Sequence, residues 1–239
     1  MTMGILTSLA QMAGERQAEL DGSIAGWRAE TGKGLRLWCG PGCGNCCTLS
    51  VNATLPEALA IAATLDSNSE ERLVAKAARV IDHARHCSDA RGFLAGYREA
   101  VGPCPFLDDT ANCTIYRQRP LACRALLSTR PAGWCGVNLG KLPEIERDAF
   151  LASLDPTVVA YPTHYAAVPR ELAADFERGL VFTMVRFIGF GVTGNLSLLV
   201  WLCGLPDFAA ALCDGAGPFR AFLDDRRIRQ PFLVQTVEP

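Results

Sequence analysis

The stretch Cys39-Gly-Pro-Gly-Cys43-Gly-Asn-Cys46-Cys47 places four thiols within nine residues. A second stretch, Cys104-Pro-Phe-Leu followed by Cys113-Thr-Ile-Tyr-Arg-Gln-Arg-Pro-Leu-Ala-Cys123-Arg124, adds three more. Several anionic sulfurs lie close together only around a cation, and soft thiolates select zinc or iron–sulfur clusters. A Cys-x2-Cys spacing with glycine inside lets two sulfurs converge on one ion. We therefore predict that these seven cysteines are metal ligands, and that six of them, all but Cys39, converge on one centre.

The four remaining cysteines are Cys87, Cys135, Cys203 and Cys213. The last two stand alone on apolar segments with helical spacing, which is typical of thiols buried in a core. The first follows His83 and His86, and we interpret this trio as a packed helix face, with metal ligation as the alternative. For Cys135, which lies beside Trp134, ligation and a place in the core both remain open.

The overall composition favours a globular protein that works without nucleic acid. Of 239 residues, 49% are hydrophobic and 20% are charged, which suits a packed core. The formal charge of −2 lacks the positive footprint of a general nucleic-acid binder. Residues 1–9 have no basic region before their short apolar run, so we expect no signal peptide and a cytoplasmic protein. In a reducing compartment, clustered thiols indicate metal binding or catalysis rather than disulfides.

One uncharged segment, Phe187 to Pro206, is about long enough to cross a bilayer. It contains several glycines, and no aromatic belt or Lys/Arg asymmetry flanks it, so we predict a buried helix entered through a glycine turn and no membrane span.

The same segment contains Gly189-Phe-Gly191-Val-Thr-Gly194, which matches the GxGxxG pattern of dinucleotide loops. Only 45 residues follow it, too few to complete a doubly wound sheet, so we favour helix-packing glycines over a nucleotide or S-adenosylmethionine loop. His164, in a loop, is an acid–base candidate at most.

The spacing of apolar residues and the capping residues predict helices on both sides of the cysteine-rich stretches, so the predicted fold is mainly α. We predict a single domain of residues 1–239, with a helical arm (1–38), a cysteine core (39–135) and a helical C-terminal part (136–239). The expected helices span residues 3–30 with a break near Gly22, 56–65 behind a Thr54/Glu57 capping box, 69–100 with an interruption at 88–92, 143–154, 169–187 and 195–212. Residues 32–45 are expected to form a loop, and residues 102–136 have no periodic pattern.

Together, Cys43-Gly-Asn-Cys46-Cys47 and the run from Cys104 to Arg124 resemble the YkgJ-type CxxCxxCC cysteine-cluster family. The resemblance covers roughly residues 39–135. It implies a zinc- or iron-chelating domain, and the broad group that includes flagellin lysine N-methylases implies S-adenosylmethionine-dependent methyl transfer associated with an iron–sulfur cluster. The pair Cys39 and Cys43 departs from the family spacing, because three residues separate them instead of two.

The number of thiols exceeds what one simple centre needs. A tetrahedral zinc ion and a 4Fe-4S cluster each require four ligands. The surplus predicts either two metal sites or one cluster with spare thiols for redox or catalytic work. A thiolate cluster is anionic, so Arg117, Arg119 and Arg124 are candidates to screen it, and we expect Arg124 to bind the cofactor. The alternative is a solvated basic loop.

Two classes of function remain open. The first is an iron–sulfur enzyme that modifies a protein, peptide or small-molecule substrate, with methyl transfer as the form implied by the resemblance. The second is a non-enzymatic protein whose metal centre is structural or is delivered to a partner. The favoured cofactor is a 4Fe-4S cluster, zinc is the alternative, and S-adenosylmethionine is a further candidate.

Overall fold

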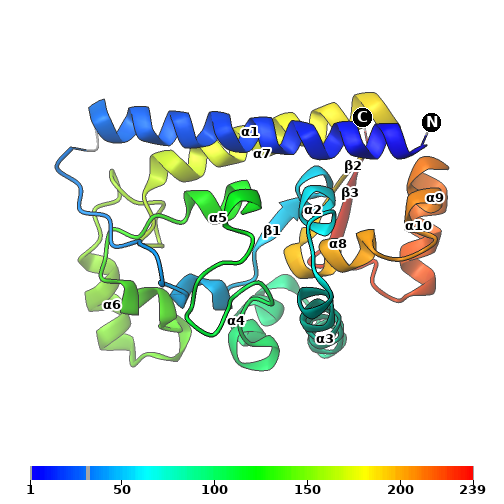
Figure 1. The fold of residues 1–239 in the computed structure, drawn as a ribbon. Coiled ribbons are helices and arrows are strands. Elements are labelled where there is room, and N and C mark those ends of the chain that lie inside the picture. The colour runs from blue at the N-terminus through cyan, green and yellow to red at the C-terminus, as the bar shows by residue number, and fades with distance from the viewer. Residues whose placement is uncertain (1, 31–32, 239) are drawn as a thin grey trace.

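The computed structural model of this protein describes residues 2–30 and 33–238 (Figure 1). This part of the chain contains ten α-helices and one three-stranded sheet, so the prediction of a mainly α fold is confirmed. The helices are α1 (Thr2–Glu30), α2 (Leu55–Ala62), α3 (Ser67–Arg85), α4 (Ala90–Val101), α5 (Leu121–Ala125), α6 (Glu144–Ala152), α7 (Ala167–Ile188), α8 (Leu196–Cys203), α9 (Phe208–Cys213) and α10 (Ala216–Asp225). The strands are β1 (Asn52–Thr54), β2 (Gly191–Asn195) and β3 (Val234–Val237).

Two long helices, α1 and α7, run alongside each other in opposite directions across the top of the molecule (Figure 1). The expected break near Gly22 is absent, because α1 is one continuous helix. Its buried residues Leu9, Ala13, Gln17 and Leu20 recur at helical spacing and form one stripe. Packing along this stripe outweighs the cost of about 1 kcal/mol that one glycine imposes on a helix.

The predicted capping box begins α2 and connects it to the cysteine-rich centre. Glu57 Oε2 accepts hydrogen bonds from the backbone nitrogen and the hydroxyl of Thr54, each at 2.7 Å. Its other oxygen, Oε1, accepts from the backbone nitrogen of Leu121 at 2.7 Å, where α5 begins. Glu57 is fully buried. One carboxylate therefore fixes the start of two helices that lie far apart in the sequence.

The predicted helix over residues 69–100 is two helices, as its expected interruption indicated. The first, α3, ends at Arg85, and the second, α4, begins at Ala90. The Asp89 side chain caps α4 by accepting a hydrogen bond from Gly92 at 2.7 Å. The helices α3 and α4 pack against each other.

The segment from Phe187 to Pro206 differs from the prediction of a buried helix. The helix α7 ends at Gly189, which adopts the left-handed conformation with φ of +85°. The chain then forms β2, which pairs antiparallel with both β1 and β3, and Asn195 caps α8. A Cβ atom on Gly194 would lie 2.3 Å from the Leu233 carbonyl oxygen, so only glycine fits there. The GxGxxG pattern is therefore a helix end and a crowded central strand, not a nucleotide loop.

The C-terminal helices also differ from the prediction. The single helix expected over residues 195–212 is divided into α8 and α9 by a turn near Gly204, and α10 was not predicted at all. None of the helices in the described ranges has the length and apolar character needed to span a membrane.

The core of the C-terminal part contains the aromatic rings of Phe190, Phe208 and Phe219, which are all buried.

Candidate metal centre

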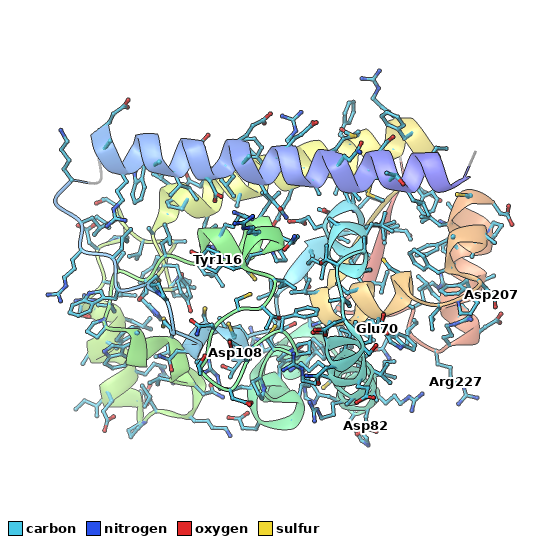
Figure 2. The ribbon with its side chains drawn as sticks, in the orientation of Figure 1. Glu70, Asp82, Asp108, Tyr116, Asp207 and Arg227 are labelled. Atoms are coloured by element: carbon cyan, nitrogen blue, oxygen red, sulfur yellow. The ribbon has the colours of Figure 1, made fainter. Side chains whose placement is uncertain are left out.

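Six cysteines from the two stretches line one cavity of about 360 Å³. They are Cys43, Cys46, Cys47, Cys104, Cys113 and Cys123. Figure 2 shows sulfur atoms gathered below α5, close to the labelled Tyr116 and Asp108. We call this space the thiol cavity. The two groups of cysteines that the sequence separates by 56 residues thus surround one space.

The first stretch reaches the cavity through a tight turn followed by a 3-10 helix, η1 (Asn45–Thr48). Gly42 has φ of +74°, a conformation that glycine adopts without strain. Its backbone nitrogen donates to Asn112 Oδ1 at 3.0 Å, which attaches the turn to the second stretch. The amide of Cys47 donates to the Gly44 carbonyl at 3.0 Å. This winding places Cys46 and Cys47 side by side on the cavity wall.

The second stretch is closed into a loop that brings its own cysteines back together. Asp108 Oδ1 accepts hydrogen bonds from the backbone nitrogens of Thr110 and Asn112 and from the Thr110 hydroxyl. These bonds lower the pKa of Asp108. Across the loop, Cys113 forms a β-bridge with Leu107. The Cys104 amide donates to the Cys47 carbonyl at 2.7 Å and thereby joins the two stretches directly.

Four of the thiols that line the cavity have a raised pKa, which favours their protonated form unless a cation enters. Burial raises the pKa of Cys104 to about 11 and also raises the pKa of Cys113 and Cys123. The pKa of Cys46 is raised by its hydrogen bond with Cys47 and by burial. A bound metal ion would offset this cost, since metal binding to thiols releases protons. Metal affinity is therefore expected to rise with pH.

Two cationic side chains, Lys76 and Arg119, line the thiol cavity. The Arg119 guanidinium lies over the Tyr116 ring at 4.5 Å, and its charge counteracts the raised pKa of Cys46, Cys113 and Cys123. Its Nε is buried and has no hydrogen-bond partner among the described residues. Lys76 is buried, and burial lowers its pKa to about 8.

Arg124 does not lie where the prediction of a cofactor-binding residue requires. It does not line the thiol cavity; its side chain is buried against α1 instead. The guanidinium forms an ion pair with Asp21 and donates to the carbonyl oxygens of Arg117 and Arg119. Arg124 thus fastens the cysteine-rich segment to α1. The sequence could not separate Arg117, Arg119 and Arg124, because all three occur within eight residues of one another.

Cys39 does not line the thiol cavity and lies near Cys135 and His164, which the sequence analysis considered separately. Its sulfur accepts a hydrogen bond from the Ser128 backbone nitrogen at 3.2 Å. The Ser128 side chain and the Tyr165 phenol are hydrogen-bonding neighbours of the Cys135 thiol. Cys135 Sγ lies 3.3 Å from His164 Nε2, and burial lowers the pKa of His164. We call Cys39, Cys135 and His164 the outer cluster.

The remaining cysteines do not line the thiol cavity. Cys87 Sγ lies 3.8 Å from His83 Nε2, but that nitrogen is 2.8 Å from the Phe93 carbonyl oxygen, and the His86 ring contacts the Asp82 carbonyl instead. These contacts favour the packed helix face over ligation. Cys203, on α8, is partly buried against the core as expected, whereas Cys213, at the end of α9, is exposed, so the prediction of a buried thiol is wrong for Cys213.

The donor set of the thiol cavity fits a soft metal centre. Six thiols are available, and the cavity is many times larger than the about 30 Å³ that one water occupies in the liquid. It therefore has room for a polynuclear cluster, or for a metal ion with a further ligand. Across residues 2–30 and 33–238, no three His, Cys, Asp or Glu side chains already form a group at metal-binding spacing.

The thiol cavity has the donor set of a metal-binding site of the cysteine-cluster kind. In comparison with known families, the model of the CxxCxxCC family, described as "Putative zinc- or iron-chelating domain", matches residues 38–141. The match includes all six cavity cysteines together with Cys39 and Cys135, and it ends before His164. It confirms the resemblance found in the sequence. Searches of the curated proteins and of the solved structures found no match.

Proposed function

We propose that the thiol cavity binds an iron–sulfur cluster. The observation that carries this proposal is that six thiols from two distant stretches line one cavity of about 360 Å³. A single tetrahedral zinc ion needs only four ligands, at bonds of about 2.3 Å to sulfur, and far less space. The ligands would come from Cys43, Cys46, Cys47, Cys104, Cys113 and Cys123. When bound, such a cluster supplies electron-transfer or Lewis-acid chemistry.

The experiment that tests this proposal is anaerobic purification followed by metal, sulfide and absorption analysis. A brown protein that contains iron and acid-labile sulfide would support the cluster. A colourless protein with about one equivalent of zinc would overturn it in favour of zinc. As a matched control, the double variant Cys46→Ala/Cys104→Ala should lose the colour and the metal, because each stretch then lacks a ligand.

We further propose that the loaded protein is an enzyme rather than a metal carrier. The thiol cavity is also lined by polar residues that are not thiols, among them Tyr97, Asn195 and Ser197. A second cavity of about 830 Å³ shares Leu49, Val51, Tyr97 and Leu126 with it. A purely structural metal site has no use for an adjoining space of this size. These features support a substrate site next to the metal centre.

The resemblance to the methylase branch makes methyl transfer the first reaction to test. The methyl group would pass from the sulfonium of S-adenosylmethionine to a nucleophilic atom of a protein, peptide or small molecule, releasing S-adenosylhomocysteine and a proton. Cluster-loaded protein, labelled S-adenosylmethionine and candidate protein or peptide substrates test it, with the Cys46→Ala/Cys104→Ala variant as the control. Transfer of iron to an apo-acceptor without labelled product would instead favour metal delivery.

A further inference from the structure

Lys76 is a charged side chain enclosed within the protein at the wall of the thiol cavity. It lies on α3 and is 1% exposed. Its Nζ donates to the carbonyl oxygens of Val101, at 3.3 Å, and of Gly102. The ammonium also lies 5.1 Å from the centre of the Tyr97 ring. Every one of these contacts is with a neutral group.

No carboxylate compensates this charge. None of the ion pairs in the described part of the chain involves Lys76. A buried charge without a partner is costly, and such charges are normally paired or bound to a ligand. The carbonyl oxygens at the C-terminal end of α4 offset part of this cost, since that end of a helix carries a partial negative charge. A full counter-charge is still absent.

The hydrogen bonds of Lys76 are also incomplete. An ammonium group has three donors, and the carbonyl oxygens of Val101 and Gly102 use two of them. The third donor has no partner among the described residues, while the side chain lines the thiol cavity. Cys104 is the cavity thiol that follows these contacts most closely in the chain, because it lies two residues after Gly102, whose carbonyl oxygen Lys76 binds, and lines the same cavity as Lys76.

We propose that Lys76 is the charge-compensating residue of the metal centre, and that its free donor binds a thiolate ligand, Cys104 in the first place. A centre of several thiolates around zinc or around an iron–sulfur cluster is anionic, so it supplies the missing counter-charge. A hydrogen bond to a ligating sulfur stabilises the more negative state of the centre and raises its reduction potential. This inference rests on the proposed function only in requiring a metal–thiolate centre in the cavity.

The alternative role for Lys76 is to cap the C-terminus of α4 and nothing more. Both roles predict that removal of the side chain lowers stability. Only charge compensation predicts that the properties of the metal centre change in protein that remains folded. A test must therefore measure the centre itself, in variants that differ in charge but retain hydrogen-bonding capacity.

The experiment compares the metal-loaded wild-type protein with Lys76→Gln, which keeps donors for the two carbonyls, Lys76→Met, which has none, and Lys76→Arg, which keeps the charge. Lys141→Met is the matched control, since Lys141 is exposed and pairs with Glu99 at 3.0 Å. Circular dichroism verifies the fold of each variant. The readouts are the chelator concentration that removes half of the metal and, for an iron–sulfur cluster, the reduction potential.

We expect both neutral variants at position 76 to lose metal at chelator concentrations about tenfold lower than wild type, the range typical for residues that support metal ligands. The reduction potential should become more negative, Lys76→Arg should restore most of the effect, and Lys141→Met should match the wild type. Folded neutral variants with wild-type metal retention and potential would overturn the inference, and so would neutral variants that both fail to fold. Wild-type protein without any bound metal would instead overturn the proposed function.

Discussion

The packed part of the molecule and the wall of the thiol cavity are built in different ways. We call helices α1–α4 and α6–α10 with the sheet the helical frame, and residues 33–47 and 102–136 the cavity wall. In the frame, α2 and α8 bury apolar side chains completely, among them Leu55, Ile61, Leu198 and Leu199. In the cavity wall, residues 33–47 contain no fully buried apolar side chain, and the wall is held by turns and single hydrogen bonds. The frame is therefore stable through its own packing, whereas residues 33–47 lack the apolar burial that would offset their ordering entropy. The second part of the wall, residues 102–136, is intermediate, because Phe106 and Leu121 are fully buried.

The largest effect that this comparison predicts follows removal of the metal. We expect anaerobic chelation to disorder residues 33–47 most, and residues 102–136 less because Phe106 and Leu121 are fully buried, while most helix content remains. Structural zinc contributes on the order of 10 kcal/mol in small domains, comparable to the whole stability of a typical domain. Circular dichroism and limited proteolysis of loaded and apo-protein measure the two regions separately. Unchanged protease resistance of both segments in verified apo-protein would mean that packing alone holds the wall.

A change inside the frame should produce the opposite pattern, with lower stability and an intact metal centre. We expect Gly194→Ala to destabilise the protein by about 3 kcal/mol, because the new Cβ would lie 2.3 Å from the backbone oxygen of Leu233 in the neighbouring strand. Gly179→Ala on α7 is the matched control, since its Cβ would meet nothing within 4 Å and alanine favours a helix by about 1 kcal/mol. Urea denaturation measures both variants, and equal midpoints would contradict the prediction.

The frame also contains a carboxyl group whose ionisation opposes folding. Burial, together with the nearby Glu57, raises the pKa of Glu177, on α7, to about 7. The folded state therefore holds this proton more tightly than the unfolded chain, so the contribution to stability is complete below about pH 4 and is lost as the pH rises through 7. We expect Glu177→Gln to stabilise the protein by up to about 2 kcal/mol at pH 8 and to have little effect at pH 4.

The control for this prediction is Glu171→Gln, an exposed position on the same helix. Urea midpoints at pH 4 and pH 8 measure the difference between the two variants. A Glu177→Gln variant that is equally stable relative to wild type at both values of pH would show that Glu177 is ionised in the fold at no cost.

The sequence predicted the features that depend on neighbours along the chain. The Thr54/Glu57 capping box and the interruption between α3 and α4 follow from local rules for helix ends, and the structure confirms them. The strand β2 was missed because its partners, β1 and β3, lie in distant parts of the sequence and its glycines are equally typical of a turn. The periodicity of apolar residues describes one segment of the chain at a time, so it cannot predict which distant strands pair.

The site could be predicted only as far as its residue types allow. Thiols are rare enough for their grouping to indicate a centre, and six of the seven predicted ligands do line one cavity. The sequence could not show that Arg124 pairs with Asp21, that Lys76 reaches the cavity, or that Cys39 lies with Cys135 and His164. These placements depend on tertiary contacts between residues 25 to 103 positions apart, for which one sequence carries no local signal.

A smaller effect is expected at the boundary between the two regions, in the outer cluster. Because Cys39 does not line the thiol cavity, we expect Cys39→Ser to retain the metal of the centre, in contrast to Cys46→Ala/Cys104→Ala. Serine can still accept the hydrogen bond from the Ser128 backbone, so the fold should change little. Metal content per chain measures the outcome. Loss of metal from folded Cys39→Ser protein would make Cys39 a ligand, as its sequence pattern predicted.

The smallest effect is expected for the two cysteines of the frame. Cys203 and Cys213 lie on α8 and α9, away from the thiol cavity, and neither has a second thiol at ligand spacing. Cys203 is partly buried and packs against the core, where burial raises the pKa of its thiol, so it behaves as a small apolar residue. The Cys203→Ala/Cys213→Ala protein should bind as much metal as the parent and lose at most about 1 kcal/mol of stability. A halved metal content would show that the frame itself holds a metal site, and the division between a packed frame and a metal-dependent wall would then fail.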